Sequence, residues 1–358
     1  MKTAYTMLVA LFLCMQTDLY SANPEIADLM QRPDTVGVFE KLEISFNVNA
    51  EFINPFDPEE IDIIATFTSP QGKTWTIHGF YCYSFGTLWK VRFSPEEAGR
   101  WNYSISIRDK NGVGISSIQS FVAIGSAKKG PLRIAGNKRY LSYGDGSDFY
   151  GVGLWYNDLY TSFNNGLVRA DELDNLKSMG VNFISSFITP LETWGSGLGR
   201  YDQNICGRLD ELLEMCEERD MLLSLNLWFH SYLSETVWGG FNIRWYTNPY
   251  QQITTARDFY RNETAWKYQE KLYRYFIARW SYSRALAIWF IVDEVNGTDG
   301  WASGDSLGAS RWGQKVHDYF KSNDPYNHPT TGTRSGGITE FWHEGYQKNA
   351  AHNHQRPE

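Results

Sequence analysis

The sequence predicts two domains: an N-terminal all-β immunoglobulin-like sandwich and an α/β domain of the (β/α)8 TIM-barrel type that is incomplete. Short strand patterns separated by turn residues fill positions 36–125, and strand and helix patterns alternate from residue 149 onward. A third observation is a buried strand pattern at 287–292 that runs directly into two carboxylates, Asp293 and Glu294. The length of 358 residues fits one sandwich-sized domain and one larger domain.

The composition limits the class of partner. Aromatic residues make up 16% of the chain, with 14 Trp and 22 Tyr. Part of this excess belongs to the core, and we expect exposed clusters to suit the apolar faces of sugar rings. The net charge of −8, without a basic stripe, argues against nucleic acid or an anionic membrane as partner. No glycine-rich phosphate loop occurs, and we predict no cofactor.

The N-terminus has the pattern of a signal peptide over residues 1–22. Lys2 is followed by an apolar run at 4–13 that is too short for a membrane anchor. We therefore predict a secreted or periplasmic protein without a membrane span. Cys14 is a poor match to a lipid-attachment site, which leaves an outer-surface lipoprotein as the minor alternative. The cysteines that remain are odd in number and give no disulfide framework.

Six strand patterns predict the sandwich. Each carries apolar residues at strand spacing, and clusters of Pro, Gly, Asn and Asp separate most of them. They lie at 38–48, 61–67, 75–83, 88–93, 101–107 and 120–124. We find no catalytic grouping in this domain, and we interpret its histidine, His78, as structural.

Strands and helices alternate in the second domain, which we predict at 131–346 after a linker at 126–131. A short hairpin at 132–143 is expected to form the floor of the barrel. The strand patterns lie at 149–154, 181–188, 221–227, 287–292 and 328–333, with amphipathic helix patterns between them. Only five or six strands are visible where a closed barrel needs eight. The tail at 347–358 has no periodicity and is expected to be disordered.

Every candidate functional residue lies at or just beyond the end of a strand, hence on one rim of the barrel. The candidates are Trp155, Asn157, Glu192, Asn226, Trp228, His230, Asp293, Glu294 and Asn296. Carboxyl groups, amides and tryptophans on a rim suit glycoside hydrolysis, in which one carboxylic acid protonates the leaving oxygen and a second carboxylate completes the reaction. A metal site is the weaker interpretation, because His230 has no partner at ligand spacing. The structural alternative is that Asp293 or Glu294 only caps the next loop.

Several motifs resemble bacterial glycoside hydrolases that join an N-terminal domain of unknown function 5060 to a clan-A-type barrel. In the sandwich the motifs are Asn54-Pro55-Phe56-Asp57, the segment 66–73, and the segments 91–95 and 99–103. In the barrel they are Asn248-Pro249-Tyr250, the segments 275–280 and 289–294, and the segment 324–331. The resemblance covers residues 36–346.

The resemblance implies that Glu294 is the acid/base. Asp293 stands where that clan carries an Asn that binds the sugar 2-hydroxyl, so this contact is in question. The clan's nucleophile follows strand seven, which this chain does not reach, and Glu344 is the only late acid that could replace it.

We therefore predict a secreted retaining glycoside hydrolase acting on a polysaccharide or oligosaccharide, with turnover impaired in this form. Glu294 is its catalytic residue, and the predicted substrate-binding residues are Trp155, Asn157, Asn226, Trp228, His230, Asp293 and Asn296. The alternative is a non-catalytic carbohydrate-binding protein or inactive paralogue.

Overall fold

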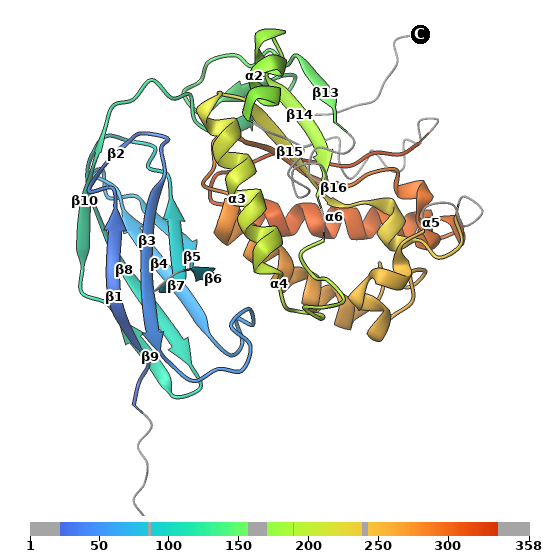
Figure 1. Cartoon of the computed structure of the whole chain (residues 1–358), viewed down its shortest axis with the longest axis horizontal. Helices are drawn as coiled ribbons and strands as arrows, with labels where there is room; N and C mark the ends of the chain where they lie inside the picture. The colour runs from blue at the N-terminus through green and yellow to red at the C-terminus, as the bar shows by residue number, and fades with distance from the viewer. Residues whose placement is uncertain (1–21, 85–86, 157–169, 189, 238–242, 336–358) are drawn as a thin grey trace, which may run out of the picture.

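The computed structural model describes residues 22–84, 87–156, 170–188, 190–237 and 243–335. Two parts lie side by side in it: a sandwich of two sheets, and a domain built on a parallel sheet with helices (Figure 1). The protein is thus multidomain and rich in β-structure, as predicted. The predicted signal peptide falls almost wholly outside the described residues, and the predicted tail lies entirely outside them.

The sandwich has a four-stranded and a six-stranded sheet in the described part of the chain. The first sheet has the order β1 (Glu25–Arg32), β3 (Leu42–Asn49), β7 (Thr87–Phe93), β6 (Phe80–Ser84). The second has the order β2 (Thr35–Gly37), β10 (Gln119–Ile124), β8 (Gly99–Asp109), β4 (Asp62–Thr68), β5 (Thr74–His78), with β9 (Gly112–Ile115) paired to β8. Alternate residues of β3 and β4, such as Phe46 and Phe67, are fully buried between the sheets. The immunoglobulin-like topology remains a prediction.

The sandwich begins earlier than the predicted residue 36. Strand β1 pairs antiparallel with β3, with Ile26 opposite Val48 and Gln31 opposite Ile44. Half of the residues in Glu25–Arg32 are apolar, but they do not alternate with polar ones, and the side chains are half-buried or exposed. An edge strand of this kind carries too little hydrophobic alternation to be recognised from sequence.

The second domain opens with the predicted hairpin, formed by β11 (Leu132–Ile134) and β12 (Leu141–Tyr143). A parallel sheet follows whose strand order equals the chain order: β13 (Gly153–Trp155), β14 (Phe183–Phe187), β15 (Leu222–Trp228), β16 (Leu286–Val292) and β17 (Thr330–Thr331). The longer helices are α2 (Ala170–Ser178), α3 (Gln203–Glu218), α4 (Glu263–Trp280) and α6 (Ser306–Asn323). Short helical turns are η1 (His230–Leu233), η3 (Trp245–Thr247), η4 (Pro249–Gln252), η5 (Val295–Gly297) and α5 (Asp299–Ala302). A closed barrel of eight strands remains a prediction.

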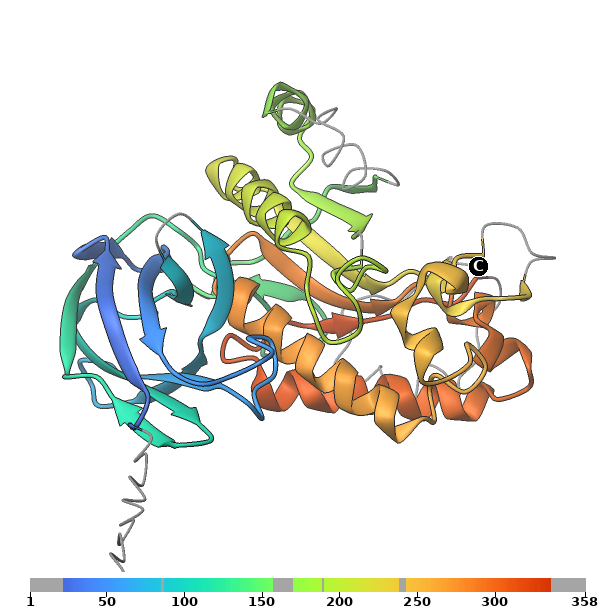
Figure 2. The same cartoon turned by 60° about the horizontal axis from the view of Figure 1, so that its bottom comes forward.

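The helices cover one face of this sheet, and strand β16 shows why. Its residues point alternately to the two faces, so Trp289 packs on Phe320 of α6 with ring centroids 5.0 Å apart. Phe290 points to the other face, where it lies 6.0 Å from Trp155. Helices α4 and α6 lie next to each other below the sheet (Figure 2). The face of the sheet that carries Phe290 is therefore not covered by these helices, and the candidate active site lies on it.

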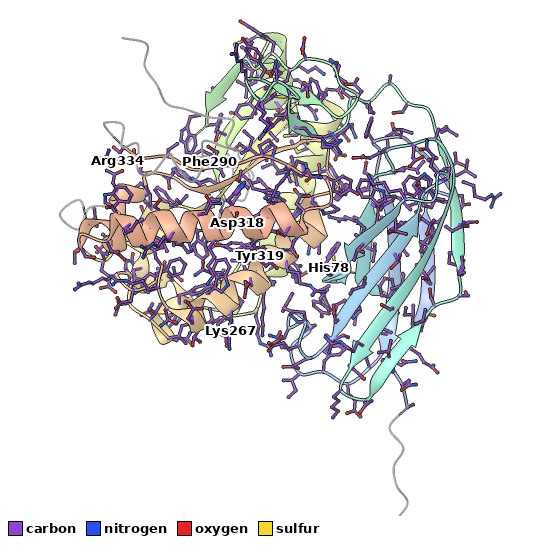
Figure 3. The ribbon with its side chains drawn as sticks, turned by 180° about the vertical axis from the view of Figure 1, so that it is seen from behind. His78, Lys267, Phe290, Asp318, Tyr319 and Arg334 are labelled. Carbon is purple, nitrogen blue, oxygen red and sulfur yellow. The ribbon has the colours of Figure 1, made fainter. Side chains whose placement is uncertain are left out.

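The sandwich packs against the helical side of the second domain. The hydroxyl of Tyr275 on α4 donates to the carbonyl of Tyr81 at 2.9 Å, and the backbone N–H of Ser94 donates to the hydroxyl of Tyr326 at 2.8 Å. Figure 3 shows His78 at this junction, with Phe290 and Arg334 farther from the sandwich.

The described residues include three cysteines and several long helices. Cys82, Cys206 and Cys216 are free and buried there. No described helix has the length and apolar character needed to cross a membrane.

Candidate active site

Glu294 follows strand β16 in a left-handed backbone conformation, with φ of 37° and ψ of 50°. This conformation is costly for a residue other than glycine and must be held by its surroundings. The Glu294 N–H donates to Thr333 Oγ1 at 3.0 Å, and the Val295 N–H donates to the Thr333 carbonyl at 3.0 Å. The Glu294 side chain is 44% exposed, so its carboxyl group is open to a ligand.

The two adjacent carboxylates line the same cavity. Strand alternation predicts that only one of Asp293 and Glu294 can face a given cleft, and this expectation is wrong. The left-handed turn at Glu294 ends the alternation, and both residues line a cavity of about 720 Å³.

Asp293 holds His230 at two atoms. Its Oδ1 accepts the backbone N–H of His230 at 2.8 Å, and its Oδ2 lies 3.0 Å from His230 Nδ1. Both residues are buried. His230 Nδ1 also lies 3.8 Å from Glu294 Oε2, so the ring stands next to the proposed acid.

Aromatic rings from three strands and one loop form a wall of the cavity. Trp155, which is 42% exposed, meets Phe187 edge-on with ring centroids 4.9 Å apart. Phe187 in turn lies 4.0 Å from Phe229. Together with Phe290 these rings present an apolar surface a short distance from Glu294.

Polar side chains occupy the inner face of the same sheet. Four buried residues on β14, β15 and β17 have polar side-chain atoms without a hydrogen-bond partner in the described part of the chain: Ser185, Ser224, Asn226 and Thr331. Both amide atoms of Asn226 are in this state. Burying such atoms without a partner costs free energy. A ligand rich in hydroxyl groups could satisfy the three that line the cavity, Ser185, Ser224 and Thr331.

Asn226 lies on the inner face, in register with Phe187 and Phe290, but it is not among the residues that line the cavity. Trp155, His230, Asp293 and Glu294 all line the cavity, as the sequence predicted for one rim.

Two predicted binding residues lie elsewhere. Trp228 points to the helical face, where its indole N–H donates to Tyr273 at 2.8 Å and its ring packs on Phe259. Its predicted contact with sugar is therefore not compatible with its place in the core. The side chain of Asn296 binds the backbone of Ser335: its Nδ2 donates to the carbonyl at 3.1 Å, and its Oδ1 accepts the N–H at 2.7 Å. Asn296 therefore holds the chain after β17. Asn157 lies outside the described residues.

Glu192, the other rim acid, lies apart from Glu294. It lines a second cavity of about 160 Å³ together with Trp194 and Trp228. Its Oε1 accepts the Gly199 N–H at 2.8 Å. Burial raises the pKa of Glu192 to about 8, so this side chain is largely neutral at pH 7.

Sequence reasoning missed the inner face itself. Phe187, Phe290 and the serines of β14 and β15 sit inside continuous buried strands, where periodicity does not separate the two faces. The signal that could have found them is the small polar residues, since Ser185, Ser224 and Asn226 interrupt otherwise apolar strands. The described residues contain no group of three or more metal-ligating side chains.

Comparison with known proteins supports both parts of the fold. The family model called Domain of unknown function (DUF5060) matches residues 35–108, which confirms that part of the resemblance. No curated protein matches the chain. The solved structure of an inferred glycoside hydrolase from Bacteroides vulgatus is similar, with a TM-score of 0.62 and 19% identity over 87% of this chain and 58% of that one.

Two further solved structures are similar at lower scores. An endo-1,4-β-mannanase from Rhizomucor miehei gives a TM-score of 0.46 and 16% identity over 62% of this chain and 67% of that one. A β-glucuronidase from Parabacteroides merdae gives a TM-score of 0.37 and 13% identity over 87% of this chain and 33% of that one. At 19% identity, the likeness to the Bacteroides vulgatus structure shows the fold alone.

Proposed function

We propose that the chain is a secreted or periplasmic glycoside hydrolase and that its cavity binds a polysaccharide or oligosaccharide. Glu294 acts as the acid/base: it donates a proton to the glycosidic oxygen as the bond from that oxygen to the sugar breaks. The observation that carries the proposal is the exposed carboxyl of Glu294, held by a left-handed turn over a cavity with an aromatic wall. A strained backbone at such a place is typical of functional sites.

The walls of the cavity support a sugar as the ligand. Trp155 and the neighbouring phenylalanines offer apolar surface to the C–H face of a ring, and the inner serines and Thr331 offer partners for hydroxyl groups. This mixture of a few polar atoms and many apolar ones is what a neutral polyhydroxylated molecule needs.

A retaining reaction needs a second carboxylate about 5–5.5 Å from the acid. Among the described residues that line the cavity, the carboxylates are Asp293 and Glu294, and Asp293 is bound to His230 at both oxygens. The nucleophile would therefore come from outside the described residues, where Glu344 lies. The proposed retaining course depends on that group.

Turnover of aryl β-glycosides by the purified full chain tests the proposal. Exchange of Glu294 for Gln should lower kcat/KM by about a hundredfold or more, because a general acid typically contributes a rate enhancement of that size. Glu235, an exposed acid that does not line the cavity, supplies the control: Glu235→Gln should keep wild-type activity. Equal activity of wild type and Glu294→Gln would contradict the role of Glu294.

The second candidate is carbohydrate binding without turnover. It is favoured by the lack of a free second carboxylate in the described lining of the cavity. Calorimetric titration with β-linked glucose, mannose and galactose oligosaccharides separates the two functions. Binding without product release, by wild type and Glu294→Gln alike, would establish the binding protein and exclude the enzyme.

A further inference from the structure

The contact between Asp293 and His230 determines which nitrogen of the ring carries the proton. A carboxylate only accepts hydrogen bonds, and Asp293 Oδ2 lies 3.0 Å from Nδ1. The neutral imidazole therefore has its proton on Nδ1, and Nε2 keeps a free lone pair. The second oxygen of Asp293 accepts the His230 backbone N–H at 2.8 Å, so the whole residue is fixed against the end of β16.

Of the polar side-chain atoms of Asp293 and His230, Nε2 of His230 is the one free to accept a hydrogen bond from a ligand. No described residue hydrogen-bonds His230 Nε2, whereas both oxygens of Asp293 are in use. The ring lines the cavity with Phe229 and Glu294 beside it, and its Nδ1 is 3.8 Å from the Glu294 carboxylate. A ligand that reaches Glu294 thus passes next to an imidazole with a defined acceptor.

We propose that Asp293 is a positioning residue that holds His230 in its Nδ1–H form. His230 Nε2 then accepts the O–H of a sugar hydroxyl next to the glycosidic oxygen that Glu294 protonates. The identity of the ligand rests on the proposed function, whereas the state of the ring does not. The site would therefore recognise a hydroxyl that can donate, and it would discriminate against sugars in which this hydroxyl is absent or methylated.

The state of the ring can be measured without any substrate. Nitrogen NMR of the full chain labelled with ¹⁵N-histidine distinguishes the two neutral forms, and His230→Gln identifies the signal of His230. In the wild type we expect the Nδ1–H form. In Asp293→Asn the carboxamide N–H can face Nδ1, and the Nε2–H form should become populated, as exchange of the orienting Asp is known to do in serine proteases.

A matched control is available at the start of α6. Asp305 caps this helix by accepting the Gly308 N–H at 3.0 Å, and Asn caps helices equally well. Asp305→Asn should leave the His230 signal unchanged. An Nε2–H form in the wild type, or the same form in wild type and Asp293→Asn, overturns the positioning role.

Measurements of oligosaccharide affinity test whether His230 Nε2 accepts a hydrogen bond from a sugar hydroxyl. Oligosaccharides that bind the wild type should bind Asp293→Asn about tenfold more weakly, because one well-placed hydrogen bond is lost. The same oligosaccharides should bind Asp305→Asn with wild-type affinity. An altered ring form with unchanged affinity would refute the contact between Nε2 and the sugar. If no sugar binds the wild type, the proposed function fails, and the NMR result still decides whether Asp293 positions the ring.

Discussion

Two regions of the second domain bury polar groups in opposite ways. At the junction with the sandwich, the carboxylate of Asp210 on α3 accepts bidentate bonds from both Arg92 and Arg279, with donor–acceptor distances of 2.7–3.1 Å, and a further bond from the Trp280 indole. On the inner face of the sheet, Asn226 and its polar neighbours have no partner in the described part of the chain.

The Asp210 carboxylate is satisfied by partners within the fold, whereas the polar atoms of the inner face have none among the described residues. Arg92 belongs to strand β7 of the sandwich, while Arg279 belongs to α4, and both are almost fully buried. Asp210 bonds to both guanidinium groups, and Glu43 of the sandwich also accepts from Arg92 Nε at 2.9 Å, so these ion pairs join the sandwich to the second domain. The two guanidinium groups hold the pKa of Asp210 well below its usual range.

The largest effect is expected at the junction. Asp210→Ala removes the carboxylate that two buried guanidinium groups share, of which Arg92 keeps its bond to Glu43, and should lower the free energy of unfolding by about 4 kcal/mol. Denaturant unfolding followed by tryptophan fluorescence measures this loss, which should affect both domains in one transition. Asp174→Ala, which removes an exposed partner of Arg219, should cost less than about 1 kcal/mol. Equal losses in the two variants would show that the junction is not a structural anchor.

The next effect concerns Glu192 and pH. Burial raises its pKa from 4.5 to about 8, so the folded state holds this proton more tightly than the unfolded state. The associated stability is fully present below pH 4.5 and is lost progressively as pH rises towards 8, by a few kcal/mol. Thermal unfolding across this range measures the slope. Glu192→Gln should flatten it, whereas Glu263→Gln, on an exposed side chain, should keep it; a slope unchanged in both variants would contradict the burial argument.

A smaller effect of opposite sign is expected on the inner face. Asn226→Leu removes two amide atoms without partners and should stabilise the chain by about 1 kcal/mol. Asn248 is the matched buried amide: its Nδ2 donates to the Tyr232 carbonyl and its Oδ1 accepts the Tyr250 N–H. Asn248→Leu should therefore destabilise by about 2 kcal/mol. Destabilisation by Asn226→Leu in urea titrations would mean that the fold itself uses this amide, and the comparison would fail.

The smallest effect is expected at the aromatic wall. Trp155→Ala removes a ring that is 42% exposed and should weaken oligosaccharide binding by about 1 kcal/mol, which calorimetric titration can measure. Trp194 is 62% exposed and lines the second cavity, so Trp194→Ala should leave affinity unchanged. Loss of affinity in the Trp194 variant alone would indicate that the sugar binds in the second cavity.

Much of the architecture could be predicted from the sequence, because it depends on local patterns. The alternation Leu42, Ile44, Phe46 identifies a strand with one buried face, and the spacing of apolar residues in 171–179 identifies α2. The run ending in Asp293 and Glu294 predicted a strand that leads into a functional loop. The edge strand β1 could not be predicted, because pairing with β3 rather than its own composition makes it a strand.

The sequence by itself determined that acids, an imidazole and aromatic rings gather at the ends of parallel strands. Only the tertiary structure decided which of them face the cavity. Trp228 and Phe229 are neighbours at the end of β15, yet Trp228 enters the helical core and Phe229 lines the site. The physical reason is that alternation is a local rule: counted from Ser224 and Asn226 it would place Trp228 on the inner face, but its contacts with Tyr273 of α4 and with Phe259 place it in the helical core.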